Sequence, residues 1–326
     1  MPYLEIAIGL VLLLAGGEFL VRGSVAVAKR MGVSTLMIGL TLVGFGTSAP
    51  ELVTSIQAAL AGSPGIAVGN VVGSNIANIL LILGVAALLL PVPVERKSFQ
   101  RDGGMLIAVS LAAVGVVMFG HLGQLVGGIF VAALIAYIIW TYFTERESGD
   151  DRAEEADHKI DAHAPAPTSL WIGILLTVGG LAAVVYGADL LVNGAIVLAL
   201  ALGVSDAVIG LTLVAVGTSL PELATTVTAA LRRQEDVAFG NVVGSNIYNV
   251  LAILGITALI LPLRVPDEII LFDIWVLLGS ALLLVLFVAV SGRVARWHGA
   301  LFLSLYGLYL AIQALPGLRT GLGIPV

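Results

Sequence analysis

The sequence has no cysteine and few charged residues. Without cysteine the chain forms no disulfide bond and has no thiol chemistry, and its redox compartment is left open. Only 11% of its 326 residues are charged, whereas 59% are hydrophobic and the mean hydropathy is +1.08. A typical globular chain is about a quarter charged and about half apolar, so this composition excludes an ordinary soluble domain.

The apolar residues form long blocks, among them 105–119 and 269–290. Such blocks approach the ~20 residues that a helix needs to cross a bilayer. Because lipid offers the backbone no hydrogen bonds, long blocks that do not alternate favour helices over the strands of a barrel. We therefore predict an all-α integral membrane protein. The ten expected transmembrane helices cover residues 4–21, 35–61, 65–90, 104–120, 123–143, 170–192, 205–231, 237–261, 269–290 and 299–315.

The basic residues lie mostly in the loops on one side of the membrane in this arrangement of spans. Thirteen of the fifteen Lys and Arg residues fall in alternate loops, and only Arg264 and Arg319 fall on the other side. The positive-inside rule places the basic loops in the cytoplasm and both termini outside. A wrong number of spans would mix the two sets, so the sorting favours ten.

The two halves of the sequence match at a separation of 171 residues. Residues 39–51 match residues 210–222 at ten of 13 positions, and the run G-N-V-V-G-S-N-I occurs at both 69–76 and 240–247. Each half holds five expected spans, and an odd number turns the second copy upside down. Inverted repeats are typical of secondary transporters, whose ion sites lie near mid-membrane.

A polar segment separates the halves. Residues 144–168 contain eight acids, three bases and almost nothing apolar, which predicts a solvated cytoplasmic linker. The expected organisation is thus a first five-helix repeat at 1–143, the acidic linker at 144–168 and an inverted five-helix repeat at 169–326.

Spans 2 and 7 each contain a proline followed at once by a glutamate, Pro50-Glu51 and Pro221-Glu222. Proline lacks an N–H group and clashes with the carbonyl four residues back, so each proline interrupts its helix and leaves a carbonyl unpaired. An ionised acid at mid-bilayer costs at least ~2.5–3.5 kcal/mol, and such residues usually mark a transport pathway. The alternative is a protonated acid that bonds to a backbone carbonyl.

Amides and hydroxyls recur every four residues on spans 3 and 8, which predicts one polar stripe on each helix. The stripes are Asn70, Ser74 and Asn78, and Asn241, Ser245 and Asn249. A hydroxyl also precedes each glutamate by four residues, at Thr47 and Thr218. We expect interrupted helices at spans 2, 3, 7 and 8 around a mid-membrane cation site. Two alternatives are open. Ser74 and Ser245 could serve only to let helices pack closely, and Asn78 and Asn249 could form a hydrogen bond between helices without contacting an ion.

All of these candidate ligands present oxygen, which suits a hard cation such as Ca²⁺ or Na⁺. Two carboxylates balance one Ca²⁺, and the same cage could hold several Na⁺ instead, which is a physical basis for exchange. Protons should compete for an empty pair of buried acids, so exchange of calcium or another divalent cation for protons is the alternative function.

Inverted repeats with occluding acids argue against a channel. An intramembrane hydrolase would need a base that Ser48 and Ser219 lack at membrane depth.

These residues resemble the cation/calcium antiporter superfamily, specifically its prokaryotic sodium/calcium exchangers. The resemblance rests on G-T-S-A-P-E and G-T-S-L-P-E, each followed by G-N-V-V-G-S-N. It implies a plasma (inner) membrane location in a prokaryote and exchange of Na⁺ for Ca²⁺ by alternating access, normally with export of calcium. It further implies that spans 1 and 6 slide against the remaining helices.

The resemblance also assigns roles. Glu51 and Glu222 would be the central calcium ligands, helped by Thr47 and Thr218. Sodium would be bound by Ser74 and Ser245 with the carbonyls of Gly44 and Ala215, and Asn78 and Asn249 would complete the middle of the cage. Some members have aspartate at the position of Asn249, and that acid is associated with potassium binding, so asparagine favours a potassium-independent exchanger.

No cofactor is expected besides the transported ions, and the expected partners are these ions and the lipid bilayer. The sequence gives no sign of nucleic-acid binding or of an obligatory protein partner. Two further acids, Glu18 and Asp189, lie near span ends, where snorkelling or capping is the favoured interpretation.

Overall fold

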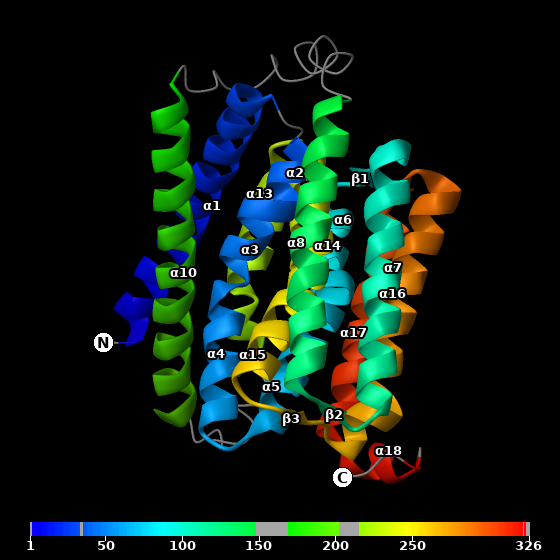
Figure 1. The fold of residues 1–326 in the computed structure, drawn as a ribbon. Helices are drawn as coiled ribbons and strands as arrows, with labels where there is room; N and C mark the ends of the chain where they lie inside the picture. Colours follow the sequence, from blue (N-terminus) through cyan, green and yellow to red (C-terminus); the bar gives the residue numbers. More distant parts are fainter. Residues whose placement is uncertain (1, 33–34, 148–168, 202–214, 322, 324–326) are drawn as a thin grey trace. The chain divides into compact units, whose positions relative to one another are not determined.

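The computed structural model describes residues 2–32, 35–147, 169–201, 215–321 and 323 (Figure 1). The predicted linker 144–168 therefore lies outside the described residues from residue 148 on, and so does the first part of the predicted span 205–231.

The described residues are almost entirely helical, with π-helical segments, labelled η, inside several helices. The elements are α1 (Pro2–Met31), α2 (Thr35–Ile38), η1 (Gly39–Val43), α3 (Gly44–Thr47), α4 (Ala49–Leu60), α5 (Pro64–Ala77), η2 (Asn78–Leu83), α6 (Gly84–Leu89), β1 (Val92–Pro93), α7 (Arg96–Met118), β2 (His121–Leu122), α8 (Gln124–Glu147), α10 (Leu170–Ala201), α12 (Ala215–Thr218), α13 (Leu220–Leu231), α14 (Glu235–Tyr248), η4 (Asn249–Leu254), α15 (Gly255–Ile260), β3 (Leu263–Arg264), η5 (Ile269–Asp273), α16 (Ile274–Ser291), β4 (Arg293–Val294), α17 (Arg296–Ala314) and α18 (Pro316–Gly321).

Seven helical stretches of the described chain are long and apolar enough to cross a membrane. They are Pro2–Met31, Pro64–Leu89, Phe99–Met118, Gln124–Thr144, Leu170–Gly194, Glu235–Ile260 and Ile269–Ser291. Each of them coincides with a predicted span. Of the other three predicted spans, 35–61 is divided among short helices, 205–231 is described only from residue 215, and 299–315 lies mostly within α17. The chain is thus a multi-pass membrane protein, and the number ten stays a prediction.

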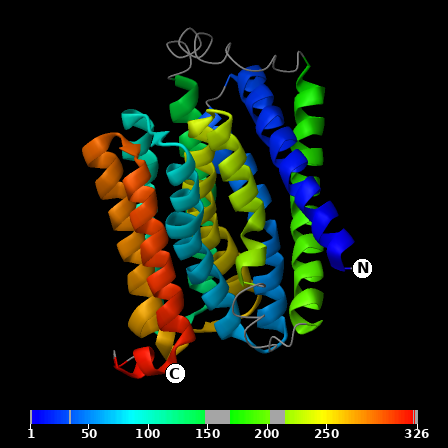
Figure 2. The same ribbon diagram turned by 180° about the vertical axis from the view of Figure 1, so that it is seen from behind.

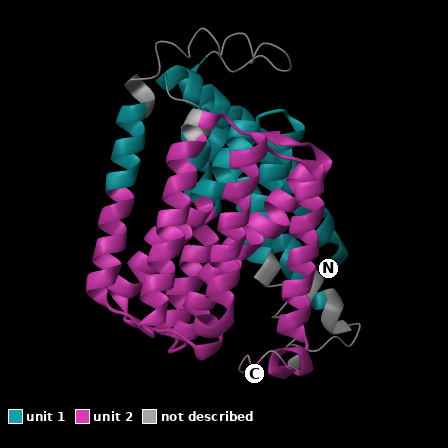
Figure 3. Cartoon of the chain, turned by 90° about the vertical axis from the view of Figure 1, so that its right-hand side faces the viewer, with its two compact units in different colours: residues 1–47, 136–244 teal, residues 48–135, 245–326 magenta. Residues whose placement is uncertain are grey.

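The described residues form two compact units (Figure 3). The first unit comprises residues 1–47 and 136–244, and the second comprises residues 48–135 and 245–326. Each unit therefore combines segments from both halves of the sequence. The division into repeats at 1–143 and 169–326 describes sequence similarity, and it does not coincide with this division into compact units.

Within the first unit, α1 and α10 run side by side over most of their length (Figure 1, Figure 2). Glycines at intervals of seven residues face each other along this pair, with Gly9 against Gly187 and Gly16 against Gly180. A Cβ atom on Gly180 would lie 2.4 Å from the backbone nitrogen of Leu20. The helices approach this closely because glycine has no side chain, the device by which many membrane helices pack. We call this contact the glycine seam.

The prediction that spans 3 and 8 are interrupted is corrected by the structure. Pro64–Leu89 and Glu235–Ile260 are each one continuous helical stretch, with a π-helical segment in the middle. Neither stretch has a proline near its centre, so no N–H group is missing there and the helix can continue. The π-helical segments η2 and η4 begin at Asn78 and Asn249, and π-helical turns are frequent at functional sites.

These two stretches are also the most buried of the seven. About four-fifths of each is inside the protein, 78% and 83%, against 28–44% for the others. The polar stripes of spans 3 and 8 are therefore on interior helices, while the other five stretches are less buried and present exposed apolar residues that suit lipid.

Two pairs of very short strands join loops of the second unit. β1 pairs with β4 and β2 pairs with β3, both antiparallel, with Val92 opposite Val294 and Leu122 opposite Leu263. Each pair connects a loop of the first sequence half with a loop of the second half, and the two pairs are equivalent to each other, because β1 corresponds to β3 and β2 to β4 in the two halves.

Candidate cation site

Glu51 lies in the first turn of α4, in the second unit. The helix of span 2 is interrupted at Ser48, whose ψ angle of 4° departs from the helical value, and α4 then begins with Pro50 in its first two positions. Proline fits there because the first N–H groups of a helix have no partner within it. Glu51 is only 1% exposed. The positive end of the helix dipole favours a negative charge at this position.

Glu222 occupies the equivalent position in the first unit. Ser219 has a ψ angle of 5°, α13 begins directly after it with Pro221 in its first two positions, and Glu222 is 1% exposed. The two proline-glutamate motifs therefore produce the same local structure, a buried carboxylate at the start of a helix, as their sequence predicts.

Asn70 holds the start of α4. Its amide nitrogen donates to the carbonyl oxygen of Glu51 at 3.2 Å and to the hydroxyl of Ser55 at 3.0 Å. These bonds attach the interior helix α5 to the helix that carries the glutamate. The amide nitrogen of Asn70 is thereby engaged in positioning the helix of Glu51.

Asn241 does the same for α13 in the first unit. Its amide nitrogen donates to the carbonyl oxygen of Glu222 at 3.3 Å and to the hydroxyl of Thr226 at 2.9 Å. Its amide oxygen lies 3.2 Å from the hydroxyl of Thr47. One buried amide thus connects the helix of Glu222 to a predicted hydroxyl ligand.

Thr47 is fully buried, and its hydroxyl also lies 3.1 Å from the carbonyl oxygen of Val43 and 3.3 Å from that of Gly44. The structure therefore brings together Thr47 and the Gly44 carbonyl, two of the predicted ligands. Thr218 is half-buried in α12, and Ala215 is the first residue of that helix.

The four remaining predicted ligands lie in the second unit and are buried: Ser74, Ser245, Asn78 and Asn249. α4, which carries Glu51, packs against η4, whose first residue is Asn249, and α5 packs against η4 as well. The helix of Glu51 and the segment that begins with Asn249 are thus neighbours within this unit.

Asn78 is 1% exposed, and neither atom of its amide has a hydrogen-bond partner among the described residues. The amide oxygen of Asn249, also 1% exposed, has none in that part of the chain either. A buried polar group without a partner costs about 1–3 kcal/mol, so proteins rarely keep one unless it binds something. Amide oxygens are ligands that Ca²⁺ and Na⁺ accept.

The described residues contain no group of three or more His, Cys, Asp or Glu side chains that could hold a metal ion. A site that uses these residues would consist of a carboxylate with neutral hydroxyl, amide and carbonyl oxygens. This donor set fits a weakly held, exchangeable hard cation better than a permanently bound transition metal.

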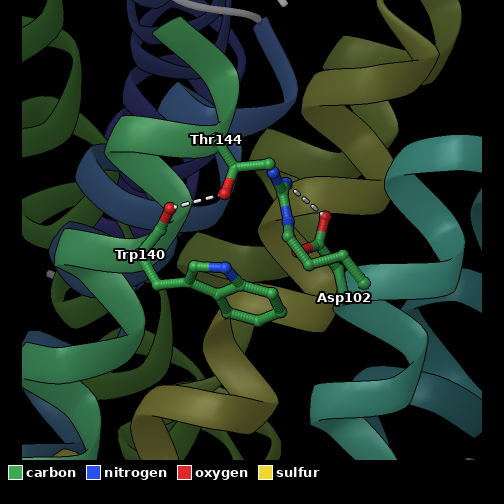
Figure 4. Close-up of polar contacts among 4 residues, drawn as sticks. Asp102, Trp140 and Thr144 are labelled. Atoms are coloured by element: carbon green, nitrogen blue, oxygen red, sulfur yellow. Dashed lines mark hydrogen bonds and ion pairs between the residues drawn. The ribbon is translucent and has the colours of Figure 1, made fainter. Parts of the chain in front are cut away.

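Two buried acids were missed by the sequence analysis, although they are 171 residues apart and so occupy equivalent positions. Asp102 is fully buried in α7 and forms an ion pair with Arg101, with N···O distances of 2.6 and 2.9 Å (Figure 4). Asp273 ends η5 and accepts hydrogen bonds from the Tyr309 hydroxyl at 3.1 Å and from the Gln313 amide. Comparing the acids of the two halves by position would have found them.

Figure 4 also shows a local bond in α8, where the Thr144 hydroxyl donates to the carbonyl oxygen of Trp140 at 2.9 Å. A threonine that bonds back one turn satisfies its hydroxyl inside an apolar helix.

Glu18 has a more specific role than snorkelling. It forms ion pairs with Arg22 one turn later in α1 and with Arg232 at the end of α13, the latter at 2.6 Å. Asp189, its equivalent in the second half, is exposed on α10. Glu18 thus connects α1 to the helix that carries Glu222.

A family model of the sodium/calcium exchanger protein matches residues 2–143 and 172–315. The chain belongs to this family. The two matched blocks leave out the acidic segment between them and coincide with the two predicted halves. Members are secondary transporters, so the chain is a membrane cation/Ca²⁺ exchanger and not an enzyme.

Several relatives are similar over nearly the whole chain. The sodium/calcium exchanger MaX1 of Methanosarcina acetivorans is 37% identical over 95% of this chain and 97% of its own. The putative antiporter CaxA of Alkalimonas amylolytica is 36% identical over 89% of this chain and 91% of its own. The structure of the sodium-calcium exchanger NCX_Mj soaked with zero Na⁺ and Ca²⁺ has a TM-score of 0.82 and 35% identity, covering 95% of this chain and 98% of that one.

Proposed function

We propose that this exchanger moves Na⁺ inward and Ca²⁺ outward through one site that includes Glu51 and Glu222. The observation that carries the proposal is the duplicated buried glutamate, each at the start of a helix and each with its backbone carbonyl oxygen bonded by an asparagine of an interior helix. One Ca²⁺ neutralises two carboxylates, and several Na⁺ can replace it. Either load balances the two negative charges, which are costly within the membrane.

Further ligands are proposed from both units. Thr47, Thr218 and the carbonyls of Gly44 and Ala215 belong to the unit of Glu222, and Ser74, Ser245, Asn78 and Asn249 belong to the unit of Glu51. The unpartnered amide oxygens of Asn78 and Asn249 support this set, because a cation would satisfy both. Potassium is not required in this proposal, since asparagine rather than an acid stands at position 249.

Exchange requires that the site open to one side at a time. We propose that α1 and α10 move together, because the glycine seam leaves no room for one to move without the other. The proposed topology has ten spans, with both termini outside and the linker 144–168 in the cytoplasm of a prokaryotic cell. It rests on the distribution of basic residues.

The test is calcium flux into vesicles that contain the purified protein. An opposed sodium gradient should drive Ca²⁺ uptake, and Glu51→Gln or Glu222→Gln should abolish it, because each removes one of two charges that balance the ion. Glu95→Gln makes the same chemical change at an exposed position and should leave the flux intact. Flux that survives both buried substitutions would refute the site.

Proton coupling is the competing assignment, since buried carboxylates also bind protons. Replacing Na⁺ by K⁺ while the pH gradient is held constant separates the two. Loss of calcium flux in K⁺ supports sodium coupling, and unchanged flux supports proton coupling.

A further inference from the structure

A chain of hydrogen bonds connects three asparagines in the second unit, around the point where η4 begins. The Asn75 amide nitrogen donates to the backbone carbonyl oxygen of Asn246 at 3.3 Å. The Asn249 amide nitrogen donates to the Asn75 amide oxygen at 2.9 Å. Asn75 and Asn249 are 2% and 1% exposed, so water does not compete for these bonds.

The direction of this chain follows from its first acceptor. A backbone carbonyl can only accept, so Asn75 must turn its NH₂ group towards Asn246. The oxygen of Asn75 then faces Asn249, which must present its own NH₂ group in return. The Asn249 oxygen is left on the opposite side of its amide, and it has no hydrogen-bond partner among the residues that the structure describes.

The equivalent amide of the first half is not held in this way. Asn78 is the counterpart of Asn249 at the separation of 171 residues, yet both atoms of its amide lack a partner within the described part of the chain. Its oxygen and nitrogen can therefore exchange places by a rotation of the side chain. The duplicated motif thus provides one amide of fixed orientation and one of free orientation.

We propose that Asn75 is a positioning residue that fixes the amide of Asn249 with its oxygen available to a cation. Asn75 contacts no ion itself. The inference rests on the proposed function in one respect, namely that Asn249 is a cation ligand. An oxygen oriented before binding loses less freedom when the ion arrives, so the fixed orientation increases affinity.

The experiment is a double-mutant cycle on calcium binding, measured by titration calorimetry on the full chain in detergent. Asn75→Leu removes both hydrogen bonds at similar volume, and Asn75→Ser is a second variant should the first not fold. We expect either change to weaken calcium binding by about three- to tenfold, the effect of one net hydrogen bond. In an Asn249→Ala background the same change should have no further effect on calcium affinity, because its target is absent.

A purely structural role of Asn75 predicts a different result. The loss of affinity would then be equal in both backgrounds, and this additivity would overturn the inference, as would unchanged affinity in the single variant. Ser110→Ala is a control for removal of a buried hydrogen bond, since that hydroxyl bonds only to the Leu106 carbonyl of its own helix, and it should leave affinity unchanged.

The two proposals fail in distinguishable ways. Calcium binding that is insensitive to Glu51→Gln would refute the proposed function and this inference with it. Binding that is lost with Glu51→Gln but unaffected by Asn249→Ala or by Asn75→Leu would leave the glutamate site in place and refute only the positioning role of Asn75.

Discussion

The two halves of this exchanger share the local structure around Glu51 and Glu222 but differ in how they stabilise a second buried acid. Both halves begin a helix with proline and glutamate and hold that glutamate through an asparagine amide. By contrast, Asp102 is paired with an adjacent arginine, whereas Asp273 is held by neutral donors, Tyr309 and Gln313. The first set of contacts is the same in both copies, whereas the second set differs, so more than one arrangement of partners can satisfy a buried carboxylate.

This difference predicts unequal responses to the same substitution, the largest effect we expect. Asp102→Asn would break the buried ion pair with Arg101, and breaking a buried pair costs about 3–5 kcal/mol. Asp273→Asn keeps an oxygen that accepts from Tyr309 and should cost only about 1 kcal/mol. The midpoints of thermal unfolding in detergent would show the contrast. Equal midpoints would contradict the different partners that the structure shows.

The glycine seam provides a contrast to the two aspartates, because equivalent substitutions in the two halves should there reduce stability to a similar extent. Gly9 and Gly180 are equivalent positions, and a Cβ atom on either would come within 2.7 Å or less of the backbone of the opposite helix. Gly180→Ala and Gly9→Ala should therefore each destabilise the protein by about 1–3 kcal/mol through overpacking. Gly179→Ala is the matched control, because no atom lies within 4 Å of a Cβ there, and its unfolding temperature should not fall.

The smallest expected effect concerns Glu18 and Asp189. Glu18→Gln removes an ion pair to Arg232, whose side chain is 44% exposed, and exposed pairs contribute about 0–1 kcal/mol. Asp189→Asn should change stability less still. Unfolding measured at low and at high salt provides the check: the effect of Glu18→Gln should decrease as salt screens the pair. A salt-independent effect would point to packing rather than charge.

Local chemistry explains which features could be predicted from the sequence. A proline followed by a glutamate in an apolar span dictates both the interruption of the helix and the burial of the acid, so these needed no knowledge of the partner helix. Asn78, Asn241 and Asn249 were found for the same reason, since a polar residue inside an apolar helix is conspicuous in the sequence, whereas the buried Asn75 and Asn246 lie outside the interval of four residues and were missed.

Features that depend on distant partners were missed. The bond between Asn75 and Asn249 joins residues 174 positions apart, and the partners of Asp273 are 36 and 40 positions away. The prediction that spans 3 and 8 are interrupted was also wrong. A π-helical turn has no sequence pattern comparable to the one around Pro50, so the sequence did not indicate that these helices continue through such a turn. The glycine seam could have been recognised from its interval of seven residues.

The most direct test of the central claim is a crystal structure of this protein soaked with Ca²⁺. The account predicts density for one calcium ion bonded to carboxylate oxygens of both Glu51 and Glu222, replaced by weaker sodium density at neighbouring positions after a soak with Na⁺ alone. An ion bound to only one of these glutamates, or to neither, would contradict it.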